Sequence, residues 1–133
     1  MTTSDSYTGT TPAFNITALP ADLDLVRIMR DEIVQHPDTA PCWMISHGDR
    51  FPMLAVGLRG EVGALMWDLG TSALVPVEGR NTTDADYFLG NRDHSPFPPG
   101  TELPAEQVLA AVDEYVRTRQ RPTCVEWQPE GQG

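Results

Sequence analysis

The chain has 133 residues, of which 40% are hydrophobic and 21% are charged, proportions typical of a one-domain globular protein rather than a disordered or two-domain chain. Nineteen Asp and Glu residues against nine Arg residues and no Lys give a formal net charge of −10. Nucleic acid is therefore an unfavourable direct partner, because every phosphate contact would have to overcome repulsion.

The first 13 residues are rich in Thr and Ser and carry one charge, Asp5, which predicts a flexible tail. They show neither the basic region nor the apolar stretch of a secretory signal, so we expect a cytoplasmic protein. A single α+β domain is expected over residues 14–128, and residues 129–133 are expected to form a loose end.

Residues 20–35 predict the first helix, because apolar side chains recur at helical spacing between Leu25 and Ile33. Asp22 and Asp24 are expected in its first turn, where carboxylates favour the positive end of the helix dipole. The helix should end at His36, since the residue before a proline disfavours the α region.

Three strands are predicted over residues 42–47, 51–59 and 62–69, and turns containing Gly48 and Gly60 join them into an antiparallel meander. The apolar run at residues 51–58 is far shorter than the roughly 20 residues that span a bilayer, so no membrane segment is expected. Residues 73–77 predict an edge strand, because Pro76 cannot donate a backbone hydrogen bond.

Residues 87–89 predict a further short strand, and Pro104 opens the second helix, with Thr101 or Glu102 as a possible N-cap. The helix presents one apolar stripe, formed by Val108, Leu109, Val112, Tyr115 and Val116. Arg117 and Arg119 lie in its last turn, where positive charge is favourable.

The Arg121-Pro122 step ends this helix, and residues 123–127 predict a final strand inside the sheet. Alternation places Val125 and Trp127 in the core, with Cys124 and Glu126 on the opposite face. Glu126 is then solvated, paired with Arg117 or Arg121, or presented to a partner.

Together these elements predict an α+β fold with a mostly antiparallel sheet of about five or six strands. Two helices with apolar stripes should pack on one face of that sheet.

The sequence has no Gly-rich phosphate loop, no cysteine pair at metal-binding spacing and no histidine pair on a helix face. We therefore expect no catalytic residue, cofactor or metal. Cys42 and Cys124 are expected to be reduced and packed as small hydrophobes. A small hydrolase using Cys42 and His47 is a further interpretation, although the large apolar residues after Cys42 favour a buried structural thiol.

Acidic residues gather in one segment, residues 78–93, which holds Glu78, Asp84, Asp86 and Asp93 against Arg80 and Arg92. Loop side chains generally point to solvent. The segment therefore either offers a carboxylate cluster to a partner or is a solvated loop.

The C-terminal third carries a specific resemblance. The helix end at residues 114–118, then Arg-Pro-Thr at 121–123 and Val-Glu-Trp at 125–127, resembles the C-terminal block of immunity protein family one from bacterial polymorphic toxin systems. Residues 86–90 and Leu103-Pro104 resemble upstream parts of that family, so the resemblance covers roughly residues 60–128. Arg119 stands where family members usually have Gly, a departure that bears on the shape of the helix exit.

The resemblance implies a non-catalytic protein without a cofactor that binds and neutralises a cognate toxin, often of the deaminase superfamily. A toxin that acts on nucleic acid is basic where its substrate lies, so an acidic inhibitor can be steered there and can block the active-site region. The alternative is a general acidic scaffold whose charge only maintains solubility.

On this interpretation the candidate toxin-binding residues are Glu78, Asp84, Asp86, Tyr87, Asp93, Glu61, Asp68 and Glu126. The residues expected to be structural are Trp127, Val125, Pro122 and Arg121.

Overall fold

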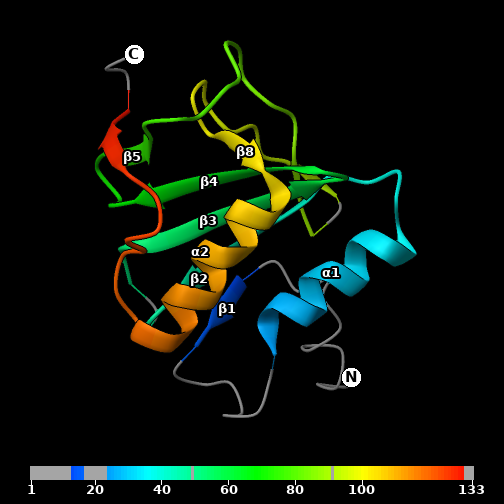
Figure 1. The fold of residues 1–133 in the computed structure, drawn as a ribbon, viewed down its shortest axis with the longest axis horizontal. Helices are drawn as coiled ribbons and strands as arrows, with labels where there is room; N and C mark the ends of the chain where they lie inside the picture. The colour runs from blue at the N-terminus through cyan, green and yellow to red at the C-terminus, as the bar shows by residue number, and fades with distance from the viewer. Residues whose placement is uncertain (1–12, 17–23, 49, 91, 131–133) are drawn as a thin grey trace.

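The computed structural model describes residues 13–16, 24–48, 50–90 and 92–130 (Figure 1). Residues 1–12 of the expected 1–13 tail and residues 131–133 of the expected 129–133 loose end lie outside these ranges. Ala13 and Pro129 belong to strands instead of loose ends. The elements are β1 (Ala13–Asn15), α1 (Leu25–Gln35), β2 (Pro41–Ser46), β3 (Met53–Arg59), β4 (Val62–Asp68), β5 (Ala73–Pro76), β6 (Phe88–Leu89), β7 (Asp93–His94), β8 (Glu102–Pro104), α2 (Ala105–Thr118) and β9 (Trp127–Pro129).

The predicted α+β class is confirmed, with one sheet in the order β7-β6-β2-β3-β4-β5-β9. The meander β2-β3-β4 forms its centre and is antiparallel, with Trp43 opposite Val56 and Val56 opposite Leu65. The sheet has nine strands instead of five or six, because β1 also pairs with β2, β7 with β6 and β8 with β4. These additional strands are two or three residues long, too short to show a periodic pattern.

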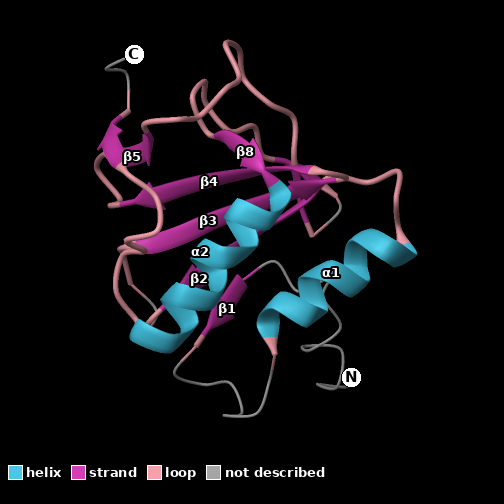
Figure 2. Cartoon of the chain, viewed as in Figure 1, coloured by secondary structure: helices cyan, strands magenta, loops and turns pink. Residues whose placement is uncertain are grey.

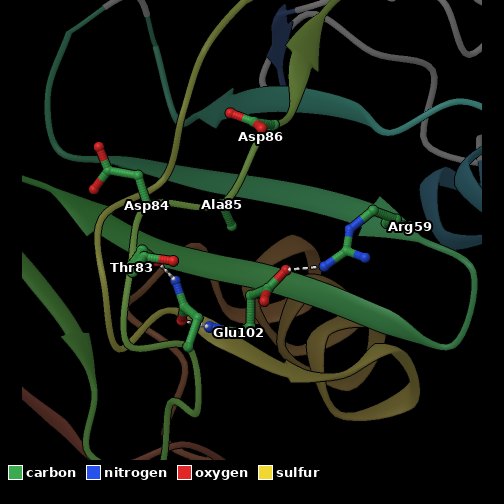
Figure 3. A pocket seen from close by; sticks show the side chains of 7 residues that line it. Arg59, Thr83, Asp84, Ala85, Asp86 and Glu102 are labelled. Atoms are coloured by element: carbon green, nitrogen blue, oxygen red, sulfur yellow. Dashed lines mark hydrogen bonds and ion pairs between the residues drawn. The ribbon is translucent and has the colours of Figure 1, made fainter.

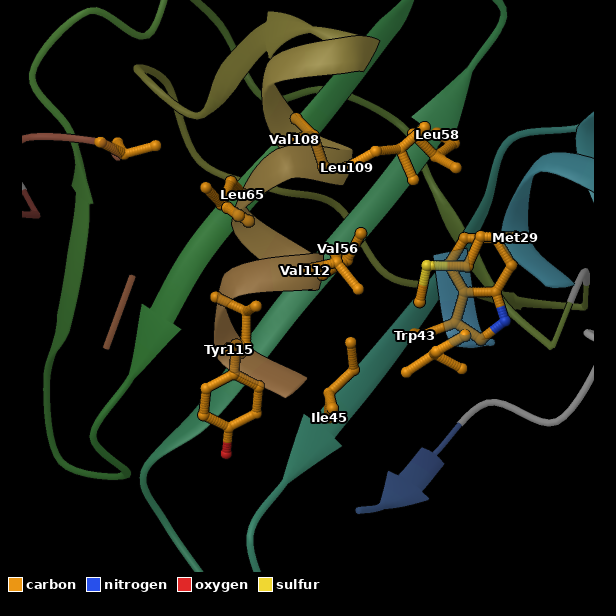
Figure 4. Packing of buried hydrophobic residues seen from close by; sticks show 14 of the residues in the cluster. Met29, Trp43, Ile45, Val56, Leu58, Leu65, Val108, Leu109, Val112 and Tyr115 are labelled. Carbon is orange, nitrogen blue, oxygen red and sulfur yellow. The ribbon is translucent and has the colours of Figure 1, made fainter. Parts of the chain in front are cut away.

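Both helices lie on the same face of the sheet, as expected (Figure 2). The predicted stripe of α2 packs its residues Val108, Val112 and Tyr115 against the central strands (Figure 4). Met29 of α1 joins this core beside Trp43, and both are nearly inaccessible to solvent. The apolar stripes therefore share one sheet face, which removes them from water together.

The start of α1 differs from the expected first turn. The helix begins at Leu25, and Asp24 is its N-cap, with the Asp24 carboxylate accepting the Arg27 N–H at 3.1 Å. Asp24 therefore satisfies a free backbone donor directly instead of acting only through the helix dipole. Asp22 lies outside the described residues, and the helix ends at His36 as predicted.

The expected side-chain caps of α2 are absent. Pro104 is the N-cap residue and makes no side-chain cap hydrogen bond, while Thr101 is buried and its hydroxyl donates to the Pro98 carbonyl. Glu102 belongs to β8, which pairs with β4 up to Pro104. The chain thus enters the helix directly from an extended strand, which leaves no room for an earlier cap.

The exit of α2 is left-handed although it contains no Gly. Arg119 has φ 60° and ψ 24°, and its N–H donates to the Tyr115 carbonyl at 2.6 Å. This is the conformation in which Gly is normally favoured because it has no Cβ. Arg119 therefore adopts the left-handed conformation that a Gly would favour at this position.

The last strand is placed differently from the prediction. Residues 123–125 form a bend, and β9 begins only at Trp127. The Glu114 carboxylate accepts the Thr123 N–H at 2.7 Å and the Cys124 N–H at 3.0 Å, so these donors are not available to a sheet. β9 therefore starts only after the contact with Glu114, at Trp127.

The positions of β5 and β9 in the sheet are the reverse of the prediction. β5, expected at the edge, lies between β4 and β9, and β9, expected inside the sheet, forms the edge. Pro76 is tolerated inside the sheet for a specific reason. The hydrogen bonds to β9 use Val77 N–H, which donates to Glu126, and the Ala73 carbonyl, which accepts from Glu130. Pro76 alternates with these positions, so its missing donor is not needed on that side.

Candidate functional site

The acidic segment packs on the sheet face opposite the helices. Ala85, Tyr87 and Phe97 are buried there against Ala55 and Ala64. Backbone hydrogen bonds between Ala85 and Phe97 at 2.9 Å close the segment into a loop. These contacts show that the segment is anchored to the sheet and is not a loose solvated loop.

Tyr87 is the central anchor of this loop. Its ring is completely buried, packs edge-on against Phe97 with centroids 5.1 Å apart, and lies over the backbone of Gly57. The Tyr87 hydroxyl donates to the Glu102 carboxylate at 2.9 Å. Burial, then this hydrogen bond, raise the pKa of Tyr87 far above its ordinary range.

Glu102 links this buried network to the surface. The Arg59 guanidinium donates to the same carboxylate oxygen at 2.7 Å, and the exposed fraction is 13% for the Glu102 side chain and 50% for Arg59. The hydrogen bond to Glu102 also raises the pKa of Arg59. One carboxylate therefore fixes both a buried tyrosine and a half-exposed arginine.

Asn81 holds the two ends of the acidic loop together. Its amide nitrogen donates to the Thr83 carbonyl at 2.8 Å and the Pro98 carbonyl at 3.1 Å. Its amide oxygen accepts the N–H groups of Thr101 and Glu102, each at 2.9 Å. Four hydrogen bonds from one side chain define the loop geometry without a regular strand.

Asp84 and Asp86 are exposed on either side of buried Ala85. They line a hollow of about 350 Å³ together with Arg59 and Glu102. Figure 3 shows the two carboxylates separated by Ala85 on the same segment, with Arg59 and Glu102 joined across the hollow. Alternation along the segment thus directs the anchors inward and the carboxylates outward.

The candidate carboxylates differ in what they already contact. Asp86 lies 2.7 Å from Nε2 of His94, and Asp93 lies 3.7 Å from Arg92. Glu78 and Asp84 are exposed and have no hydrogen-bond or ion-pair partner among the described residues. Within residues 78–93, these two are therefore the carboxylates most available to a partner.

The other candidate residues do not join this site. Glu61 and Asp68 flank opposite ends of β4, and the Asp68 carboxylate accepts the Gly70 N–H at 2.8 Å. Glu126 is exposed and lies opposite Val77, whose N–H donates to its carbonyl at 2.8 Å. Glu126 is thus near Glu78, while Glu61 and Asp68 are separate.

The C-terminal block holds the structural candidates. Val125 and Pro122 are buried, and the half-buried Trp127 donates its indole N–H to the Pro122 carbonyl at 2.9 Å. Arg121 is exposed. The suggested pairing of Glu126 with Arg117 is not seen, since Arg117 pairs with Asp113 at 3.0 Å.

Cys42 and His47 do not form a catalytic pair. Cys42 is buried under the acidic loop, and burial raises the pKa of its thiol to about 11. His47 is exposed just after β2 and its backbone contacts Tyr115 on the helix side. A nucleophilic cysteine needs the opposite pKa shift. Cys124 is free but exposed, contrary to the expectation that it packs.

Within the described part of the chain, no group of three or more His, Cys, Asp or Glu side chains could hold a metal ion. Among the same residues, neither helix is long and apolar enough to cross a membrane.

Sequence reasoning missed several residues of this site, namely Arg59, Asn81, Glu102 and Gly57. They lie far from the acidic segment along the chain or are common loop residues. No local pattern could have identified their shared role.

Residues 20–129 match the family model described as immunity protein Imm1. No curated protein matches the chain.

Proposed function

Because the chain belongs to the Imm1 family of immunity proteins, we propose that it neutralises a cognate nucleic-acid-acting toxin of the deaminase type by covering its basic active-site region. The anchored acidic loop supports this proposal best. It presents exposed carboxylates on a scaffold fixed by Tyr87, Asn81 and Glu102. A loop that is already ordered loses little conformational entropy on binding.

Charge supports the same proposal. A net charge of −10 attracts a basic groove and accelerates association. Glu78 and Asp84 have no ion-pair partner among the described residues, so a toxin Arg or Lys could pair with them without breaking an existing contact. An acidic scaffold that only needs solubility would not require carboxylates on an anchored loop.

The proposal is tested with a catalytically inactivated toxin domain encoded by the adjacent gene. Association and dissociation rates are measured at low and high salt for Asp84→Ala, Asp86→Ala and Asp93→Ala. Asp31→Ala is the matched control, because Asp31 is also exposed but lies on α1, across the sheet. Loss of a steering charge should slow association mainly at low salt, since the screening length is about 8 Å at 0.15 M salt.

Loss of a carboxylate that is buried in the complex should instead accelerate dissociation. The binding free energy should then weaken by about 2 to 5 kcal/mol. If all three variants keep the rates of the parent, then Asp84, Asp86 and Asp93 make no contact with the toxin. A parent protein that neither binds this toxin nor protects cells that express it would overturn the proposed function itself.

A further inference from the structure

A second hollow, of about 770 Å³, opens between β5, β9 and the 98–100 stretch. We propose that this hollow is the centre of the toxin interface, where it receives an apolar side chain of the toxin flanked by Arg or Lys residues. The inference rests on the proposed function, and it extends the contact surface beyond the carboxylates.

Apolar residues form part of the walls of this hollow, beside polar ones. Val75 is buried beneath it, while Val77, Pro98 and Pro99 also line it. The exposed fraction of Val77 is 46%, high for a large apolar residue. Its backbone N–H is already bonded to Glu126, so the side chain is held at the surface by an ordered strand end. Protein interfaces place such apolar groups at their centre and polar groups at the rim.

One carboxylate lines the hollow, and two more lie next to Val77 without lining it. Glu130 lines the hollow, Glu78 directly follows Val77 in the chain, and Glu126 lies opposite Val77. Arg80 is the cation among the lining residues. Counting these neighbours, three carboxylates stand against one cation beside the exposed Val77, a surplus that complements an apolar side chain flanked by basic ones.

The hollow also adjoins the carboxylates of the acidic loop. Asn81 lines both hollows, so the two hollows are adjacent. A toxin that covers both would contact Asp84 in one hollow and Val77 in the other.

The hollow is preformed by tight backbone contacts. A Cβ on Gly79 would lie 1.7 Å from the Gly100 carbonyl oxygen, so the two walls approach each other closely. The Gly100 N–H donates to the Asn81 carbonyl at 2.9 Å, and the Asn81 side chain donates to Pro98. A partner would find the hollow already shaped, which lowers the entropic penalty of association.

The test uses Val77→Arg with Val34→Arg as the matched control. Both valines are exposed and both substitutions add one positive charge, but Val34 lies on α1 across the sheet. Binding to the inactivated toxin domain encoded by the adjacent gene is measured by surface plasmon resonance. We expect the complex of the toxin with Val77→Arg to dissociate at least tenfold faster than the complex with the parent. The dissociation rate of the Val34→Arg complex should remain within twofold of the parent rate.

Thr82→Arg is a second variant, on an exposed residue that lines the same hollow, and it decides the outcome if Val77→Arg does not fold. Parent-like dissociation of the folded variants would overturn this inference and leave the proposed function standing. If the parent protein does not bind the toxin, both this inference and the proposed function are wrong. Light scattering on the protein alone completes the test, because a dimer abolished by Val77→Arg would assign the hollow to a second copy of the chain and overturn the inference.

Discussion

The ring of Tyr87 fills the space in which a side chain on Gly57 would lie, since a Cβ at Gly57 would be 2.6 Å from the Tyr87 Cδ1 atom. Gly57 lies in the middle of β3, where a residue without a side chain normally weakens a strand. Here it lets the anchor of the acidic loop sit directly on the sheet. The close packing of the acidic loop on β3 therefore depends on the absence of a side chain at Gly57.

Gly57→Ala should lower the free energy of unfolding by about 1 to 3 kcal/mol, because the Tyr87 ring must move. Urea denaturation measures this change. The double variant Gly57→Ala/Tyr87→Leu should lose less than the sum of the single variants, since contacting residues are not additive. Additive losses would show that the two positions are independent.

Tyr87→Phe should lower the free energy of unfolding by about 1 kcal/mol, the usual net value of one hydrogen bond, here the bond to Glu102. The raised pKa of Tyr87 adds a pH dependence. The stabilisation linked to this group is complete below its unfolded value of about 10 and is lost as pH rises through the folded pKa. Denaturation between pH 8 and about 11 should therefore show a steeper loss for the parent than for the Phe variant. Parallel curves would contradict this linkage.

Glu114→Gln should remove a stabilising contribution that depends on pH. Hydrogen bonds from Thr123, then from Cys124, lower the pKa of the Glu114 carboxyl below its ordinary value of 4.5. The stabilisation is complete above pH 4.5 and is lost as pH falls through the lowered folded pKa. Thermal melting at pH 7 should show the variant below the parent, with the difference narrowing toward pH 3. A difference that is constant with pH would mean that the ionised carboxylate is not the cause.

Arg119→Gly should stabilise the protein by about 0.5 to 1 kcal/mol, because Gly adopts the left-handed conformation of this residue without a Cβ clash. Arg117→Gly is the matched control. It lies inside the helix, where Gly should be destabilising by about 1 kcal/mol. Chemical denaturation of both variants checks the opposite signs, and a destabilised Arg119→Gly would show that the Arg side chain stabilises the exit.

Local sequence patterns predicted the helices and strands that are formed by interactions between neighbouring residues. The stripe from Val108 to Tyr115 identified α2, and alternating strands with glycine turns identified the meander, because each depends on neighbours within a few residues. The position of β9 could not be predicted in this way. It depends on the Glu114 carboxylate, which accepts hydrogen bonds from the backbone N–H groups of Thr123 and Cys124 after the chain has turned back.

The acidic site shows the same division. Carboxylates in residues 78–93 were visible in the sequence, but their support by Asn81 and Glu102 depends on contacts across about 20 residues. Val77 was assigned to a strand and gave no sign of its exposure. Exposure of an apolar residue is a property of the assembled surface and has no local signature.

The edge formed by β9 has a consequence for how other chains can approach the sheet. Glu126 and Glu130 make backbone bonds to β5, so alternation turns the backbone groups of Trp127 and Pro129 outward. Pro129 has no N–H, which leaves Trp127 as the outward donor within this three-residue strand. An edge with so few donors is a poor template for an added strand, so pairing with another chain is disfavoured at this edge of the sheet.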